Sequence, residues 1–183
     1  NNKGTEDNRV RKLDYSIQIS KIFYERFIKN AEITLFSPNN VPDLYEAFGM
    51  PEFDDLYLKY EKDKSIPKKT IGAQELFMAL LKERAETGRI YIMNLDHCNT
   101  HSSFKDKVYM SNLCQEITLP TTPVQHIDDK EGEIALCILS AINLGLLTDM
   151  KELEELCDLS VRALDEIIDY QEYPVEAAKI SAQ

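Results

Sequence analysis

The sequence predicts an α/β fold in which amphipathic helices alternate with short strands of a largely buried, parallel sheet. Helical and β-rich patterns follow one another along the 183 residues, as they do in α/β domains. Residues 133–139 are nearly all apolar, which is typical of a strand covered on both faces. Only about three or four runs read convincingly as strands, against roughly 5–6 in a usual sheet. We therefore expect a helix-rich arc of a larger barrel or sheet.

The first part of the chain alternates helical and extended patterns. Residues 11–29 predict a helix because apolar side chains recur on one face, and residues 32–36 predict a short strand that ends at turn residues. Residues 42–49 predict a short helix and the glycine that closes it, and a further helix begins at Pro51. Residues 62–69 are charged and predict a connector. The apolar positions of the first and last of these helices are Leu13, Ile17, Ile22, Phe23 and Phe27, and Phe53, Leu56, Tyr57 and Tyr60.

A longer helix is predicted in the middle of the chain, over residues 72–87, with Gly88 at the position of a C-terminal cap. Its apolar face consists of Leu76, Phe77, Leu80 and Leu81. Residues 89–94 form a β-rich run and predict a strand. Residues 95–110 are polar and predict a loop, whereas residues 111–120 predict an extended segment that stops at a proline.

The clearest helix of the sequence is predicted over residues 150–169. Asp149 is placed to cap it, with Glu152 three residues later, as in a capping box. Pro174 lies at or just beyond its end. The apolar stripe of this helix consists of Leu153, Leu156, Cys157, Val161, Leu164 and Ile168.

Composition restricts the function classes. A formal net charge of −11 disfavours binding to a nucleic-acid backbone. No apolar run approaches the ~20 residues of a membrane span, and no export signal is visible. The four cysteines are widely spaced, which favours free thiols in a reducing compartment, so we expect a cytoplasmic protein. The chain lacks an initiator Met and its tail stops within a pattern, so we also expect a piece of something longer.

The segment with the most chemical content is residues 112–116. In extended backbone Asn112, Cys114 and Glu116 would point to one face, about 7 Å apart at ~3.3 Å rise per residue. One reading of Cys114 is a small buried hydrophobe. The other reading is a functional thiol, because a strand face that carries an amide and a carboxylate is costly to bury. Spacing alone leaves both interpretations open.

The remaining cysteines carry weaker patterns. Cys137 lies in an apolar run and Cys157 on an apolar helix stripe, so both predict structural positions. Cys98 lies between His97 and His101, which raises the alternative of a small zinc protein. A structural zinc site requires four ligands, usually as two spaced pairs, and no second pair is present in the sequence. Hydrogen-bonded loop residues therefore explain this cluster better.

These residues also form a wider pattern. Asn112, Cys114 and Glu116 match the Asn-x-Cys-x-Glu pattern of the catalytic large subunit of aerobic ribonucleotide reductases, and the chain resembles that family over most of its length. The sequence after Cys137 is similar to the diphosphate-reducing, di-iron-dependent class Ia branch. The other segments that carry the resemblance are residues 8–11, 35–38, 87–92, 96–101, 132–137, 140–145, 162–165 and 169–174.

The resemblance implies a ten-stranded α/β barrel with the radical cysteine on a loop inside it. Residues 1–183 would be a single, incomplete segment of that barrel domain, without the N-terminal ATP-binding region and the C-terminal half. By the same resemblance, Cys114 would become a thiyl radical, Glu116 would act as base for the 3′-hydroxyl, and Asn112 would hold the ribose. Leu113 would join these three in the substrate site. Cys137 would be one of two thiols that supply reducing equivalents.

The resemblance also implies partners and cofactors. The radical would come from a di-iron small subunit, ATP and dNTP effectors would bind elsewhere in the full subunit, and this chain itself would bind no cofactor or metal. Its partners would be the remainder of the large subunit, the small subunit, thioredoxin or glutaredoxin, and a ribonucleoside diphosphate. The family's second thiol has no match among Cys98 and Cys157, so we expect the isolated chain to be inactive. The alternative is a catalytically inactive assembly or scaffold fragment that requires partner chains.

Overall fold

The structure is a computed structural model that describes Thr5, Asp7 and residues 13–183. Residues 8–11 and the start of the helix predicted over 11–29 lie outside the described residues. The chain divides into two compact units, Asn1–Thr118 and Leu119–Gln183, and each is considered by itself. No helix in the described part is both long and apolar enough to cross a membrane.

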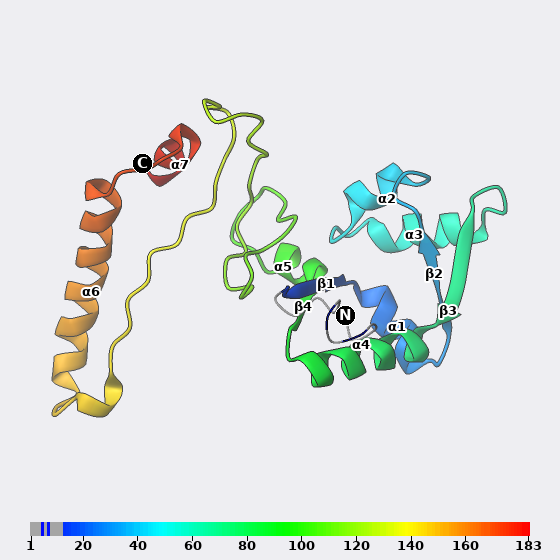
Figure 1. The fold of residues 1–183 in the computed structure, drawn as a ribbon, viewed down its shortest axis with the longest axis horizontal. Coiled ribbons are helices and arrows are strands. Elements are labelled where there is room, and N and C mark those ends of the chain that lie inside the picture. Colours follow the sequence, from blue (N-terminus) through cyan, green and yellow to red (C-terminus); the bar gives the residue numbers. More distant parts are fainter. Residues whose placement is uncertain (1–4, 6, 8–12) are drawn as a thin grey trace. The chain divides into compact units, whose positions relative to one another are not determined.

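The first unit contains two separate two-stranded sheets (Figure 1). Strand β1 (Tyr15–Ile19) pairs in parallel with β4 (Ile90–Asn94), with Tyr15 opposite Ile90. Strand β2 (Glu32–Phe36) pairs antiparallel with β3 (Lys68–Gly72). The expected parallel sheet is therefore limited to one pair of strands, and the described residues form an α/β arrangement without a closed barrel.

Most helices of this unit follow the predictions. Gly88 adopts the left-handed conformation, φ +66°, that ends the longest of them as predicted, because glycine has no Cβ to clash there. Gly49, with φ +83°, likewise follows the short helix predicted to end there. The helices are α1 (Lys21–Ile28), α2 (Pro42–Ala47), α3 (Phe53–Lys62), α4 (Ala73–Thr87) and α5 (Leu95–Thr100).

Three predictions for residues 13–110 were wrong. Residues 15–19 form β1 rather than the first turns of a helix, because they pair with β4 far along the chain. The charged connector contains the start of β3, where the Lys68 ammonium donates to the C=O groups of Tyr60, Glu61 and Asp63 near the end of α3. Cations are favoured at helix C-termini, so this charge has a structural use. The polar loop after residue 94 begins with the helix α5.

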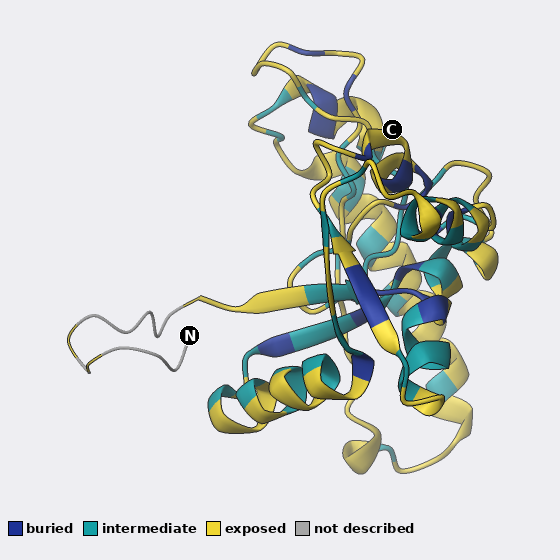
Figure 2. Cartoon of the chain, turned by 90° about the vertical axis from the view of Figure 1, so that its right-hand side faces the viewer, coloured by how far each residue is buried: buried dark blue, intermediate teal, exposed yellow. Residues whose placement is uncertain are grey.

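The core of the first unit lies between the β2–β3 pair and helices α1 to α4. Tyr57 is buried within it, and its hydroxyl donates to the C=O of Thr34 and accepts from the N–H of Thr34, so β2 is tied to α3. A second cluster, Met93, Leu95 and Val108, lies under α5. Buried residues are dark blue in Figure 2. The main cluster consists of Ile22, Ile33, Val41, Leu44, Ala47, Phe53, Tyr57 and Ala73.

The second unit contains helices but no strand among its described residues. Residues 133–139 run without a ladder partner and expose Leu136 and Leu139, so the prediction of a strand covered on both faces was wrong for this segment. A strand requires a neighbour to bond its N–H and C=O groups. The helical elements are η1 (Leu144–Leu146), α6 (Lys151–Tyr170) and α7 (Glu176–Ala182).

Helix α6 confirms the helix predicted over residues 150–169. Asp149 accepts the N–H of Lys151 at 3.1 Å, as expected of a residue at a helix start, whereas Glu152 accepts from the hydroxyl of Thr148 rather than from Asp149. The helix ends before Pro174, as predicted. None of its residues is buried, and Val161 on the apolar stripe is 67% exposed. The stripe is therefore only partly covered within the described residues, since Leu153, Leu164 and Ile168 are half-buried.

Candidate active site

Residues 112–115 form a tight turn, so the prediction of an extended segment was wrong. The N–H of Gln115 donates to the C=O of Asn112 at 3.2 Å, and Gln115 has a positive φ of 67°. Leu113 and Cys114 occupy the centre of this turn. Asn side chains offer the backbone local hydrogen bonds that compete with strand pairing, which explains the turn. Asn112, Cys114 and Glu116 are thus grouped by a bent loop, and not along one face of a strand.

Hydrogen bonds of Asn112 and Ser111 close the loop. The Asn112 Oδ1 accepts the N–H of Ile117 at 3.0 Å. The Ser111 hydroxyl lies 2.5 Å from the C=O of Ile117 and 3.0 Å from Asn112 Oδ1, so it can donate to either. The Nδ2 of Asn112 has no hydrogen-bond partner among the described residues. The carboxamide therefore has its oxygen engaged in the loop and its donor available to a ligand.

The thiol and carboxylate of this loop face solvent in the segment. Cys114 and Glu116 are exposed, and the Leu113 side chain is 55% exposed. A thiol at the tip of a turn with a carboxylate two residues away can reach a molecule that approaches from outside the loop. Cys114 is exposed in this loop. The interpretation of this cysteine as a small buried hydrophobe was therefore wrong for the described residues.

The other cysteines differ in environment. Cys137 and Cys157 are both exposed in the second unit, so neither has the buried structural position predicted for it. Cys98 is half-buried on α5 beside the Met93, Leu95 and Val108 cluster. Burial, with the nearby Asp96 carboxylate, raises the pKa of the Cys98 thiol and disfavours its reactive thiolate form. Cys114 and Cys137 belong to different units of the chain, and each is described within its own unit.

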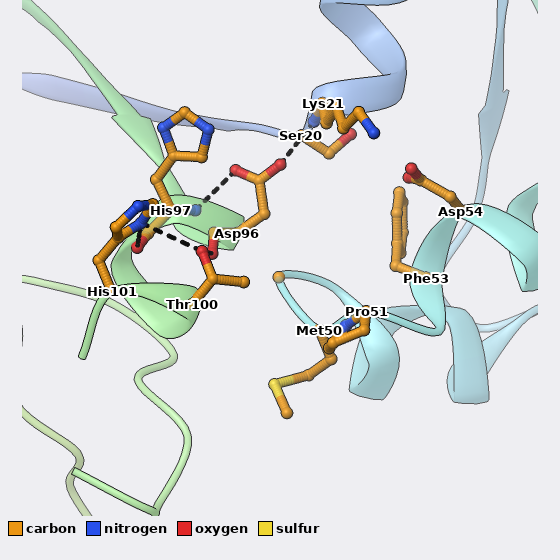
Figure 3. A pocket seen from close by; sticks show the side chains of 11 residues that line it. Ser20, Lys21, Met50, Pro51, Phe53, Asp54, Asp96, His97, Thr100 and His101 are labelled. Atoms are coloured by element: carbon orange, nitrogen blue, oxygen red, sulfur yellow. Dashed lines mark hydrogen bonds between the residues drawn. The ribbon is translucent and has the colours of Figure 1, made fainter. Parts of the chain in front are cut away.

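A pocket of about 350 Å³ lies beside α5 (Figure 3). Asp96 organises one side of it: one oxygen accepts the N–H of Lys21 at 2.7 Å and the other the N–H of His97 at 2.9 Å. The same carboxylate therefore binds an N–H group in the first turn of α1 and another in the first turn of α5, where a negative charge is favourable. Across the pocket, burial raises the pKa of the Asp54 carboxyl, although the Lys21 charge opposes this. The pocket is lined by Ser20, Lys21, Gly49, Met50, Pro51, Phe53, Asp54, Asp96, His97, Thr100 and His101.

The two histidines of this region serve local structure. Their rings lie 5.6 Å apart, and the Nδ1 of His101 is 3.1 Å from the C=O of His97 and 3.2 Å from the Thr100 hydroxyl. Among the residues that the structure describes, no group of three or more His, Cys, Asp or Glu side chains is placed to hold a metal ion. Local hydrogen bonds thus engage the His101 ring at the end of α5.

The sequence analysis missed two residues of β1, Ser16 and Gln18, that bind the loop. The Gln115 Nε2 donates to the Ser16 hydroxyl at 2.7 Å, and the Gln18 Nε2 donates to the C=O of Tyr109 at 2.7 Å. Ser16 and Gln18 are alternate residues of β1 and therefore point to one face of that strand. No local pattern indicates such contacts, because nearly a hundred positions separate Ser16 from Gln115 along the chain.

Comparison with known proteins agrees with the motif. The whole chain, residues 1–183, matches the family described as ribonucleotide reductase, barrel domain. The chain belongs to this family, which confirms the resemblance drawn from residues 112–116 and the segments around them.

Similar proteins are ribonucleoside-diphosphate reductase alpha subunits. The chain is 58% identical to that of Buchnera aphidicola subsp. Schizaphis graminum, 59% identical to that of Haemophilus influenzae and 57% identical to the subunit named ribonucleoside-diphosphate reductase 1 subunit alpha in Escherichia coli. Each alignment includes 100% of this chain and 24% or 25% of the relative. The chain thus spans about a quarter of the length of these relatives.

Proposed function

We propose that this chain forms part of the catalytic barrel of a ribonucleotide reductase large subunit. Within a complete subunit it would reduce ribonucleoside diphosphates to deoxyribonucleoside diphosphates. The observation that carries the proposal is the turn at residues 112–115, on which the Cys114 thiol is exposed two residues before the exposed Glu116, in a chain of this family. The Asn112 Nδ2 has no partner among the described residues. The names of the relatives support the diphosphate substrate.

Cys114 would start and end the chemistry. A small radical-generating subunit with a di-iron centre would remove one electron and one proton from the thiol, which leaves a thiyl radical. That radical would take the 3′-hydrogen atom of the ribose, so that an S–H bond forms and a C–H bond breaks. After reduction at the 2′ carbon, the same S–H would return its hydrogen atom to the 3′ carbon. Cys114 is therefore regenerated as a radical and is not consumed.

Glu116 and Asn112 would handle the hydroxyl groups. A carboxylate within about 2.6–3.2 Å of a hydroxyl is a competent general base, so Glu116 would take the 3′-hydroxyl proton and later return it. The Nδ2 of Asn112 would donate to a ribose hydroxyl, since its oxygen already accepts from Ile117. Leu113, at the centre of the same turn, would contact the substrate. A neutral amide orients a hydroxyl without exchanging protons with it.

Cys137 would supply reducing equivalents. Replacement of the 2′-hydroxyl by hydrogen, with release of water, requires two electrons and two protons in total. Cys137 and a second thiol, which we place on another part of the large subunit, would provide them and become a disulfide. Thioredoxin or glutaredoxin would then reduce that disulfide. ATP and dNTP effectors would bind elsewhere in the subunit, and this chain alone would be inactive.

A second candidate function is assembly without catalysis. Two features favour it: the largely exposed stripe of α6, and the run 133–139, which has no strand partner among the described residues. Exposed apolar faces and unpaired strands require a covering partner. In this case the chain would complete a larger barrel without contributing its thiol. Both functions predict association with the remaining parts of the large subunit, so only activity separates them.

The test reconstitutes this chain with the rest of the large subunit, the small subunit and a dithiol reductant, and measures deoxynucleotide formation. Native protein would be compared with Cys114→Ser and with the matched control Cys157→Ser, which changes another exposed cysteine. We expect Cys114→Ser to fall to background and Cys157→Ser to retain native turnover. Equal turnover of Cys114→Ser and native protein would overturn the radical role. Co-purification with unchanged turnover would then favour the assembly function.

A further inference from the structure

The loop that carries Cys114 is fastened to strand β1 at two points. Gln115 reaches from the loop to the hydroxyl of Ser16, and Gln18 reaches from β1 to the C=O of Tyr109 at the beginning of the loop. Both contacts are 2.7 Å long, within the normal range for N–H···O bonds. The Gln18 Nε2 also lies 3.9 Å from the sulfur of Met93 on β4, the strand that pairs with β1.

Of the two contacts, the bond between Gln115 and Ser16 bears more directly on Cys114. Gln115 follows Cys114 in the sequence and is one of two non-glycine residues of the described chain with positive φ. This conformation is unfavourable for a residue with a Cβ, so the turn relies on bonds that hold it. The side-chain bond to Ser16 and the backbone bond to Asn112 both end on Gln115. They hold both the side chain and the backbone of the residue that follows Cys114.

Strand β1 is a suitable anchor. Each of its residues has a partner in β4, with Ser16 opposite Tyr91 and Gln18 opposite Met93. The strand leads directly into α1, whose first N–H, on Lys21, is bound by Asp96. The strand is thus fixed to β4, and the start of the helix is fixed to the segment that follows β4. Position errors of about 1 Å at a reacting group can reduce rate about a hundredfold, so a rigid anchor matters for hydrogen-atom transfer.

We infer that Gln115 and Ser16 form a clamp that positions the Cys114 thiol relative to the bound ribose. The inference rests on the proposed function and deepens it: Gln115 and Ser16 are positioning residues that touch neither substrate nor cofactor. The clamp holds the turn in the conformation in which the thiol, the Glu116 carboxylate and the Asn112 donor are available together. Its loss leaves substrate binding in place and lowers the fraction of time in which the sulfur is aligned.

The test uses the reconstituted reductase and four variants of this chain. Gln115→Met keeps the side-chain volume and removes the donor, whereas Ser16→Ala removes the acceptor. Ser16→Thr keeps a hydroxyl and is the rescue variant. Gln74→Met is the matched control, because Gln74 makes an exposed bond of the same kind, from Nε2 to the C=O of Phe27, elsewhere in the first unit.

We expect Gln115→Met and Ser16→Ala each to lower kcat about three- to tenfold with KM unchanged, as for loss of one exposed hydrogen bond. The double variant should be no slower than either single variant, because both remove the same bond. Ser16→Thr and Gln74→Met should keep the native kcat. Additive losses in the double variant, or native kcat in both single variants while Cys114→Ser is inactive, would overturn the clamp.

A second readout does not depend on activity. Amide hydrogen exchange at residues 112–117 should become faster in Gln115→Met and Ser16→Ala, while the melting temperature stays within about 2 °C of native, since surface changes have small effects on stability. If Cys114→Ser proves as active as native protein, the proposed function fails, but this exchange measurement still reports whether the clamp exists. Unchanged exchange at residues 112–117 would exclude it.

Discussion

The side-chain oxygen of Asn112 accepts the backbone N–H of Ile117 at 3.0 Å. This bond spans the turn that contains Cys114, so the residue expected to hold the ribose also closes the loop on which the thiol lies. Its two ends have separate tasks: the oxygen maintains the loop and the nitrogen is available for a ligand. Substitutions at position 112 can separate these tasks.

Asn112→Asp and Asn112→Ala should differ in loop order although both reduce activity. Aspartate keeps an oxygen acceptor for Ile117 and loses the Nδ2 donor, so we expect an ordered loop with impaired turnover. Alanine loses both, and the loop bond alone contributes about 0.5–1.5 kcal/mol. Amide exchange of Ile117, measured beside steady-state turnover, checks this: exchange should accelerate about two- to tenfold only in the alanine variant. Equal exchange in both variants would show that the oxygen of Asn112 does not hold the loop.

Gly49 and Gly88 offer a matched comparison for stability. Both have positive φ, but a Cβ on Gly49 would lie 2.7 Å from Leu95 Cγ, whereas one on Gly88 would meet nothing within 4 Å. Gly88→Ala should cost about 1–2 kcal/mol from backbone strain alone. Gly49→Ala should cost about 1–3 kcal/mol more, because the packing around Leu95 must also shift. Urea unfolding of the two variants measures the difference, and equal losses would contradict the close approach at Gly49.

Tyr57→Phe should destabilise the first unit. The Tyr57 hydroxyl serves both backbone groups of Thr34, as acceptor at 2.6 Å and donor at 3.0 Å, and the side chain is 4% exposed. Its removal leaves buried polar groups without that partner, at a cost of about 1–3 kcal/mol. Tyr45→Phe is the control, since Tyr45 is 61% exposed, and it should change the free energy of unfolding by less than about 0.5 kcal/mol. Similar urea midpoints for the two variants would argue against the bridging role.

Asp129 should titrate below the ordinary aspartate range. Its carboxylate accepts the N–H groups of Gln125 at 2.8 Å, Glu131 at 2.8 Å and Gly132 at 3.2 Å, and these bonds lower its pKa. The folded pKa lies below the unfolded value, so the stabilisation is fully present above the unfolded pKa. It is lost as pH falls through the folded pKa.

An NMR titration of the Asp129 carboxyl carbon and of the three amide protons measures this. All four signals should share one midpoint below about 3.9, the usual aspartate value. In Asp129→Asn the amide signals should lose that titration step, because the amide does not ionise. A midpoint at or above the usual value would mean that the three N–H groups do not stabilise the charged form.

Local patterns predicted the helices α2, α3, α4 and α6 and the strands β2 and β4 to within a few residues. Helical hydrogen bonds connect residues four apart, so side-chain periodicity and caps such as Gly88 contain most of the required information. The same holds for the grouping of Asn112, Cys114 and Glu116, which lie within five consecutive residues. Their conformation was predicted wrongly, because the turn depends on which bonds Asn112 makes, and spacing alone does not specify them.

The sequence by itself determined the family, the residues of the candidate site and the positions of most helices. Tertiary structure alone decided that residues 15–19 become β1 through pairing with β4, that β3 lies alongside β2, and that Gln115 meets Ser16. It also decided that residues 133–139, apolar as they are, have no strand partner among the described residues. The physical reason is that a strand or an anchoring bond is completed by groups far along the chain, whereas a helix completes its own hydrogen bonds.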